Sequence, residues 1–135
     1  MAKKKKILII EDNPRIYDEF FTSLKQKYDI SVSNSLESAY RMLGIYHFDL
    51  TIIDVMLKPI NPSVNYYRAG FEFYFSHIKL KYPLMRVIFW SSLMEDTINI
   101  FFMEKGGVPP NVHIVSKNLY PNEFKYFVDS IISSK

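Results

Sequence analysis

The sequence contains no cysteine, which excludes disulfides and thiolate chemistry. It has no uninterrupted apolar run near the roughly 18–20 residues that a membrane-spanning helix needs. The basic segment 3–6 precedes only four apolar residues, 7–10, a stretch shorter than the hydrophobic region of a secretory signal. From these absences we expect a soluble, cytoplasmic protein that does not contact a membrane.

The sequence also lacks a broad excess of positive charge, although its pI is near 9.0. Its 17 Lys and Arg exceed its 14 Asp and Glu by three, and without the lysines at 3–6 the count would be 13 against 14. A solvated leader before the first strand is the simpler interpretation of those lysines, and contact with nucleic acid or a membrane is the alternative. Nucleic acid is therefore not expected to be a partner of the folded part of the chain.

At 135 residues, of which 48% are hydrophobic, the chain suits a single domain spanning 1–135. Short apolar runs at 6–10, 50–53, 87–90 and 112–115 are typical of strands, and at 30–32 apolar and polar residues alternate as on an edge strand. Each of these segments is followed by apolar residues at helical spacing. Five strands alternating with five helices through short connections predict an α/β fold with a doubly wound parallel sheet and helices on both faces.

Local signals predict where several helices begin and end. Asn13 and Pro14 would cap and open the first helix. Asn34 and Glu37 resemble a capping box for the second helix, which we expect to end at Gly44. Gly106 and Gly107 are expected to close the fourth helix. From the fifth helix we expect four residues to face the core: Phe124, Phe127, Val128 and Ile131.

Polar side chains follow four of the predicted strands at the point where each strand ends. They are Glu11 and Asp12 after the first strand, Asp54 after the third, Ser91 after the fourth and Lys117 after the fifth. The carboxyl ends of parallel strands meet at one edge of a sheet, where open α/β folds bind their ligands. Three carboxylates converging there would repel one another, so the set predicts a hard divalent cation such as Mg²⁺.

This set resembles the active site of the response-regulator receiver domain of two-component signal transduction, and the resemblance covers the whole chain. It implies the flavodoxin-like strand order 2-1-3-4-5. It also implies that Asp54 accepts a phosphoryl group from a sensor histidine kinase or a histidine phosphotransfer protein, switching a partner or output surface. The implied Mg²⁺ ligands are Glu11, Asp12, Asp54 and the backbone carbonyl of Met56, while Ser91 and Lys117 would contact phosphoryl oxygens.

The resemblance further implies that the protein is no enzyme beyond Mg²⁺-dependent self-phosphorylation from a phosphodonor and autodephosphorylation. Its partners would be the phosphodonor protein and an output domain or a second copy of itself. A receiver-like interaction module that works without phosphorylation is the alternative left open.

Three positions depart from the family's pattern. Asn118 follows Lys117 where the family usually has proline, commonly after a cis peptide, so we expect a trans peptide here. Ile114 replaces the aromatic residue that often couples phosphorylation to the surface. Sixteen positions separate Asp54 from Gly70, about twice the usual spacing, so residues 58–69 form an insertion. We expect it to cover the site partly; the alternatives are that Tyr66 and Tyr67 extend the partner surface or that they only pack against the third helix.

Two other families are disfavoured by individual residues. A haloacid-dehalogenase-type phosphatase needs a second acid two positions after the aspartate, where this chain has Met56. A flavodoxin relative needs a glycine- and hydroxyl-rich phosphate loop after the first strand. Here that segment begins with Glu11 and Asp12, and the whole chain has only four glycines.

Overall fold

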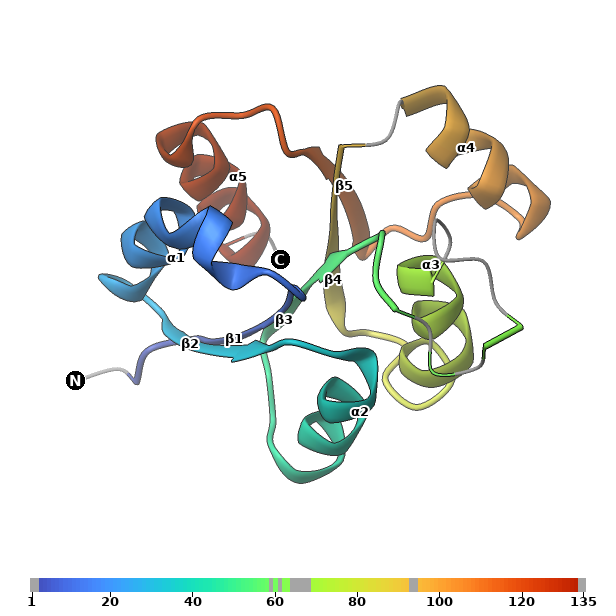
Figure 1. Ribbon diagram of the computed structural model, residues 1–135, viewed down its shortest axis with the longest axis horizontal. Coiled ribbons are helices and arrows are strands. Elements are labelled where there is room, and N and C mark those ends of the chain that lie inside the picture. Colours follow the sequence, from blue (N-terminus) through green and yellow to red (C-terminus); the bar gives the residue numbers. More distant parts are fainter. Residues whose placement is uncertain (1–2, 59, 61, 64–68, 93–94, 134–135) are drawn as a thin grey trace.

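The computed structural model describes residues 3–58, 60, 62–63, 69–92 and 95–133. Its five strands form one parallel sheet in the order β2-β1-β3-β4-β5, which confirms the predicted fold and strand order (Figure 1). The strands are β1 (Lys6–Ile10), β2 (Asp29–Ser33), β3 (Leu50–Asp54), β4 (Arg86–Ser91) and β5 (Val112–Ser116).

Helices cover both faces of the sheet. A 3-10 turn, η1 (Pro14–Tyr17), leads into α1 (Asp18–Lys25), and α3 (Ala69–Phe73) continues into a π-helical turn, η3 (Tyr74–Ile78). The other helices are α2 (Leu36–Ile45), α4 (Glu95–Glu104) and α5 (Pro121–Ser133). In Figure 1, α1 and α5 lie on one side of the sheet and α2, α3 and α4 on the other.

Alternation along the strands divides the core into two parts. Leu8 and Ile10 pack with residues of α2, α3 and α4, whereas Ile7 and Ile9 pack with residues of α1 and α5. The strand β3 is buried along its whole length, as expected for a central strand covered on both faces. Its last residue, Asp54, therefore lies at the carboxyl end of the central strand.

Two local predictions about helix ends were wrong. Ser35, and not Asn34, caps α2: its extended backbone lets Oγ accept a hydrogen bond from the backbone N of Ser38 at 3.1 Å. Gly44 does not stop this helix, which continues to Ile45. Asn13 and Pro14 do stand at the N-cap and first positions of the 3-10 turn η1 that precedes α1, but the side chain of Asn13 makes no capping bond.

Two further expectations concern α4 and α5. Gly106 and Gly107 follow α4 with φ of 95° and 103°, which confirms that this pair closes the helix. On α5, Phe127 is 44% exposed and does not face the core as predicted. The buried stripe of α5 is narrower, because Phe124, Val128 and Ile131 already fill the space over the sheet.

The insertion 58–69 is described only in part. Tyr66 and Tyr67, to which the sequence assigned a covering or partner role, lie outside the described residues. After the insertion the chain returns to β3, where the backbone N of Gly70 donates a hydrogen bond to the carbonyl of Val55 at 3.0 Å. Among the described residues, no helix combines the length and apolarity needed to cross a membrane.

Candidate functional site

The carboxyl edge of the sheet brings the three predicted acids together. Glu11 and Asp12 follow β1 and Asp54 ends β3, and one carboxylate oxygen from each lies within 4.8 Å of the others. Glu11 and Asp54 are only 2% and 5% exposed, while Asp12 is exposed to solvent. The site therefore joins two buried carboxylates to one that solvent can reach.

Lys117, just after β5, supplies the positive charge next to these acids. Its Nζ lies 3.1 Å from Asp54 Oδ2, 3.2 Å from Glu11 Oε2 and 3.2 Å from the hydroxyl of Tyr17. Burial by itself lowers the pKa of Lys117, but the Asp54 and Glu11 carboxylates outweigh it and raise the pKa above its ordinary value. An ammonium group has three N–H donors, so each has an acceptor here.

Tyr17 is a site residue that the sequence did not indicate. Its spacing with the apolar residues of α1 is typical of a residue that packs in the core. In the structure it lies in η1, and the Lys117 ammonium is 4.4 Å from the centre of its ring and 4.9 Å from that of Trp90. Tyr17 and Trp90 also pack edge to face at 4.5 Å. Two aromatic rings thus enclose the lysine on the side facing the core.

Glu11 carries the largest pKa shift that bears on the site. Burial, together with the hydrogen bond and negative charge of Asp54, raises the pKa of Glu11 to about 8, although Lys117 offsets part of the effect. A buried carboxyl that keeps its proton at neutral pH indicates that the single positive charge of Lys117 does not neutralise both Glu11 and Asp54. An added divalent cation would complete the balance, and carboxylate oxygens are ligands that Mg²⁺ prefers.

The remaining predicted site residues lie around Asp54. The backbone N of Met56 donates a hydrogen bond to Asp54 Oδ1 at 3.1 Å, so its peptide lies beside the carboxylate. Ser91 is buried at the end of β4, and its carbonyl accepts a hydrogen bond from the backbone N of Lys117 at 2.9 Å. Their roles as metal ligand and phosphoryl contact stay predictions.

The departures seen in the sequence have structural counterparts. The described residues contain no cis peptide, so the bond before Asn118 is trans as expected. The backbone N of Asn118 donates a hydrogen bond to Ser116 Oγ at 3.0 Å, which shapes this loop without proline. Ile114 is half-buried on β5 and packs beside the core under α2, α3 and α4.

Comparisons with known proteins agree with this geometry at the level of fold. No protein-family model matches the sequence, and no curated protein matches it. Solved structures do match over nearly the whole chain. A CheY-like response regulator receiver domain protein from Methanospirillum hungatei JF-1 has a TM-score of 0.74 at 18% identity, over 96% of this chain and 94% of that one.

Two further receiver structures are similar in the same way. The chemotaxis response regulator CheY4 of Vibrio cholerae has a TM-score of 0.75 at 16% identity, with 96% of this chain and 99% of that chain covered. The HemR receiver domain from Leptospira biflexa, in its non-phosphorylated form, has a TM-score of 0.72 at 22% identity, with 98% and 97% covered. The chain therefore has the fold of CheY-like receiver domains, which confirms the resemblance seen in the sequence.

Proposed function

We propose that this protein is a receiver domain that accepts a phosphoryl group on Asp54 and thereby switches a surface used by a partner or output domain. The observation that carries the proposal is the convergence of Glu11, Asp12 and Asp54 within 4.8 Å, with the Lys117 ammonium 3.1 Å from Asp54, at the carboxyl edge of a receiver fold. A sensor histidine kinase or a histidine phosphotransfer protein in the cytoplasm would supply the phosphoryl group.

In the proposed reaction an oxygen of Asp54 forms a bond to phosphorus while the bond from phosphorus to the donor histidine nitrogen breaks. Glu11, Asp12, Asp54 and the Met56 carbonyl would hold Mg²⁺, which supplies positive charge against the phosphoryl oxygens. Lys117 faces Asp54 Oδ2 and can turn from it to a phosphoryl oxygen. Glu11 and Tyr17 keep the ammonium in place during that turn, since it bonds to both.

Mixing the protein with acetyl phosphate and Mg²⁺ should add one phosphoryl group, detected by intact-mass measurement. We expect the adduct to disappear in the Asp54→Asn variant, because its amide offers no nucleophilic carboxylate oxygen. It should also disappear when a chelator removes Mg²⁺, because the acids and the incoming phosphate then lack the positive charge of the cation. Asp29→Asn is the matched control: Asp29 is exposed at the start of β2, at the opposite edge, and its variant should gain the same mass. A parent protein that gains no mass with Mg²⁺ would instead favour the phosphorylation-independent interaction module.

Lys117→Ala should separate metal binding from phosphorylation. Because the ammonium contacts Glu11 and Asp54, removing it takes positive charge away from two predicted ligands, so we expect Mg²⁺ affinity to be kept or to rise. Loss of the contact to the phosphoryl group should slow phosphorylation by acetyl phosphate about 100-fold. Fluorescence of Trp90, the only tryptophan, measures Mg²⁺ binding, and mass measurement follows phosphorylation.

Lys25→Ala, an exposed lysine at the end of α1, is the matched control and should change neither quantity. A large loss of Mg²⁺ affinity in Lys117→Ala would contradict the assignment of Lys117 to the phosphoryl group.

A further inference from the structure

The edge of the sheet opposite the acids is a continuous surface made by the segments that precede the strands. The backbone N of Asp29 donates to the carbonyl of Lys5 at 2.9 Å, which joins the start of β2 to that of β1. The backbone N of Lys6 donates to Asp49 Oδ2 at 2.8 Å, which joins β1 to the segment before β3. These contacts place the α1–β2 and α2–β3 connections side by side.

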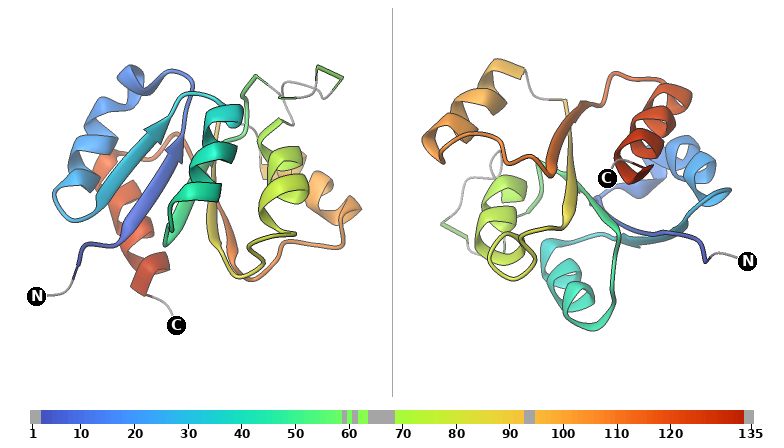
Figure 2. Two further views of the ribbon diagram at one scale, coloured as in Figure 1. Left: turned by 90° about the horizontal axis from the view of Figure 1, so that it is seen from below. Right: turned by 180° about the vertical axis from the view of Figure 1, so that it is seen from behind.

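Hydrogen bonds extend the same surface to the other two connections. Nδ2 of Asn111, before β5, donates to the carbonyl of Pro83 at 3.2 Å, and the backbone N of Val87 donates to the carbonyl of Asn111 at 3.0 Å. In the left view of Figure 2, the amino ends of the strands lie along the lower side and the carboxyl ends along the upper side. The two edges of the sheet therefore face in opposite directions.

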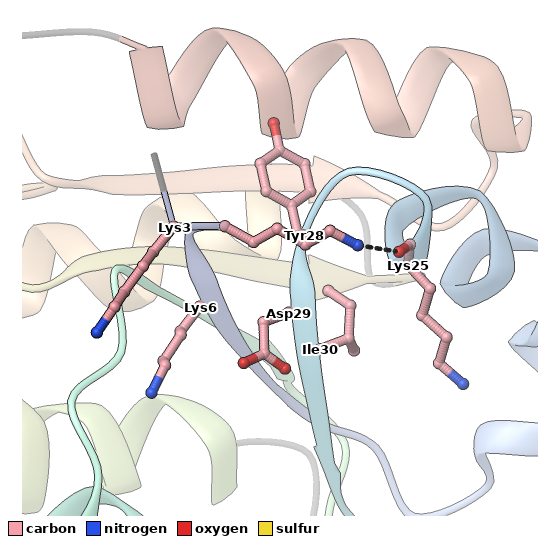
Figure 3. A pocket seen from close by; sticks show the side chains of 7 residues that line it. Lys3, Lys6, Lys25, Tyr28, Asp29 and Ile30 are labelled. Atoms are coloured by element: carbon pink, nitrogen blue, oxygen red, sulfur yellow. Dashed lines mark hydrogen bonds between the residues drawn. The ribbon is translucent and has the colours of Figure 1, made fainter. Parts of the chain in front are cut away.

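Lysines gather on this amino edge. Lys3, Lys4, Lys6 and Lys25 line a cavity of about 450 Å³, and the Lys4 ammonium reaches the carbonyl of Lys25. Figure 3 shows Lys3, Lys6 and Lys25 extending from the surface on both sides of Asp29. Lys5 and Lys27, both exposed, adjoin this group in the sequence.

Three acids beside these lysines reduce their positive charge only partly. Asp129 pairs with Lys27 at 3.4 Å and accepts a hydrogen bond from Tyr28, and Asp49 is bonded to Lys6 and lies 3.5 Å from His47. Asp29 lines the cavity itself. These six lysines outnumber the three acids beside them, so this part of the amino edge is positive, whereas three acids gather at the carboxyl edge.

Exposed apolar side chains stand on the same edge. Leu84, in the connection before β4, is 89% exposed, and Ile45, Tyr46 and Leu80 are each more than half exposed. Leu84 borders a cavity of about 460 Å³ that is also lined by Asp49, the residue bonded to Lys6. We call this combined surface the basic–apolar edge; it comprises Lys3, Lys4, Lys5, Lys6, Lys25, Lys27, Ile45, Tyr46, Leu80 and Leu84.

We propose that the basic–apolar edge binds the surface of a membrane that contains anionic lipids. Lysines attract such a surface, and leucine, isoleucine and tyrosine at loop positions enter the boundary between headgroups and acyl chains. Nucleic acid would use the lysines, but its phosphate contacts would leave Leu80 and Leu84 without a role. The absence of a long apolar run led us to expect no membrane contact, but that argument excludes only a spanning helix.

This orientation of the protein on a membrane is compatible with the proposed function, but the proposal does not depend on that function. With the basic–apolar edge on a membrane, Asp54 and the other acids at the carboxyl edge face away from the negatively charged surface. A partner protein can then still reach them.

The test is sedimentation of the full chain with vesicles of phosphatidylcholine mixed with phosphatidylserine, and with vesicles of phosphatidylcholine alone. We expect binding to the mixed vesicles only, weakening as salt is added. The double variants Lys3→Gln/Lys5→Gln and Leu80→Ser/Leu84→Ser should each weaken binding on the order of tenfold. All four side chains are exposed, so we expect these variants to fold.

Matched controls remove the same chemistry from the carboxyl edge. Arg15→Gln/Lys58→Gln removes two exposed positive charges and Ile16→Ser removes an exposed apolar side chain, and neither should change binding. No binding to the mixed vesicles would overturn the proposal. Binding that survives Leu80→Ser/Leu84→Ser while mixed-sequence duplex DNA binds equally well would also overturn it, and would identify a nucleic-acid surface instead.

Discussion

Replacing Gly70 with alanine is expected to lower the free energy of unfolding by about 2–3 kcal/mol and to slow phosphorylation of Asp54. A Cβ built on Gly70 would lie 2.7 Å from the carbonyl oxygen of Asp54 and 2.8 Å from the Cα of Val55. Both neighbours are backbone atoms of the segment that carries the proposed phosphoacceptor, so no side chain can rotate to relieve the overlap. The backbone at Asp54 has to move, and its carboxylate moves with it.

Gly44→Ala is the matched control for this prediction. Gly44 lies within α2, and nothing is within 4 Å of a Cβ placed there. Alanine in a helix interior should therefore raise the free energy of unfolding by about 0.5–1 kcal/mol. Chemical denaturation followed by the fluorescence of buried Trp90 measures both variants. Equal stability of the two variants would show that the contact of Gly70 with β3 is unimportant.

The amino-acid sequence predicts the sheet well because buried parallel strands have a distinct pattern. The strand β3 is mostly apolar before Asp54, and the run 87–90 of β4 is apolar before Ser91, so each strand and its polar end can be recognised together. Parallel pairing then places those ends at one edge without any knowledge of side-chain contacts. For this reason the grouping of Glu11, Asp12 and Asp54 was accessible from the sequence.

Predictions failed where the local backbone conformation, and not the spacing of residues, decides which side chain makes a contact. Asn34 and Ser35 are both good capping residues, and only the backbone conformation of Ser35 selects it. Tyr17 has the spacing of a core residue, yet its hydroxyl reaches Lys117 because the chain enters α1 through a 3-10 turn. Such contacts depend on the direction of a side chain, which periodicity does not specify.

In metal-free buffer, stability is expected to fall as the pH rises, because Glu11 keeps its proton in the folded state. Burial and Asp54 raise the pKa of Glu11 from 4.5 to about 8, so between these values the unfolded chain releases a proton that the folded chain holds. The contribution of Glu11 is fully present below pH 4.5 and lost above pH 8, about 5 kcal/mol in total.

The titration of His113 changes the free energy of unfolding with pH in the opposite direction. Burial, helped by Arg86, lowers the pKa of His113 below its ordinary value of 6.5, so this residue makes stability rise with pH, and its effect ends near pH 6.5. Between pH 6.5 and 8 the change in the free energy of unfolding therefore comes from Glu11 and not from His113. There we expect the free energy of unfolding to fall by about 2 kcal/mol.

Denaturation at several pH values, with a chelator present, checks this prediction. Glu11→Gln should give a flat profile between pH 6.5 and 8, because its amide cannot ionise. Glu37→Gln, which changes an exposed glutamate on α2, should keep the slope of the parent protein. Adding Mg²⁺ to the parent should also flatten the profile, since a cation beside Glu11 favours the ionised carboxylate. A parent profile that is already flat without metal would show that Glu11 is ionised at neutral pH, and that Lys117 alone balances the two buried acids.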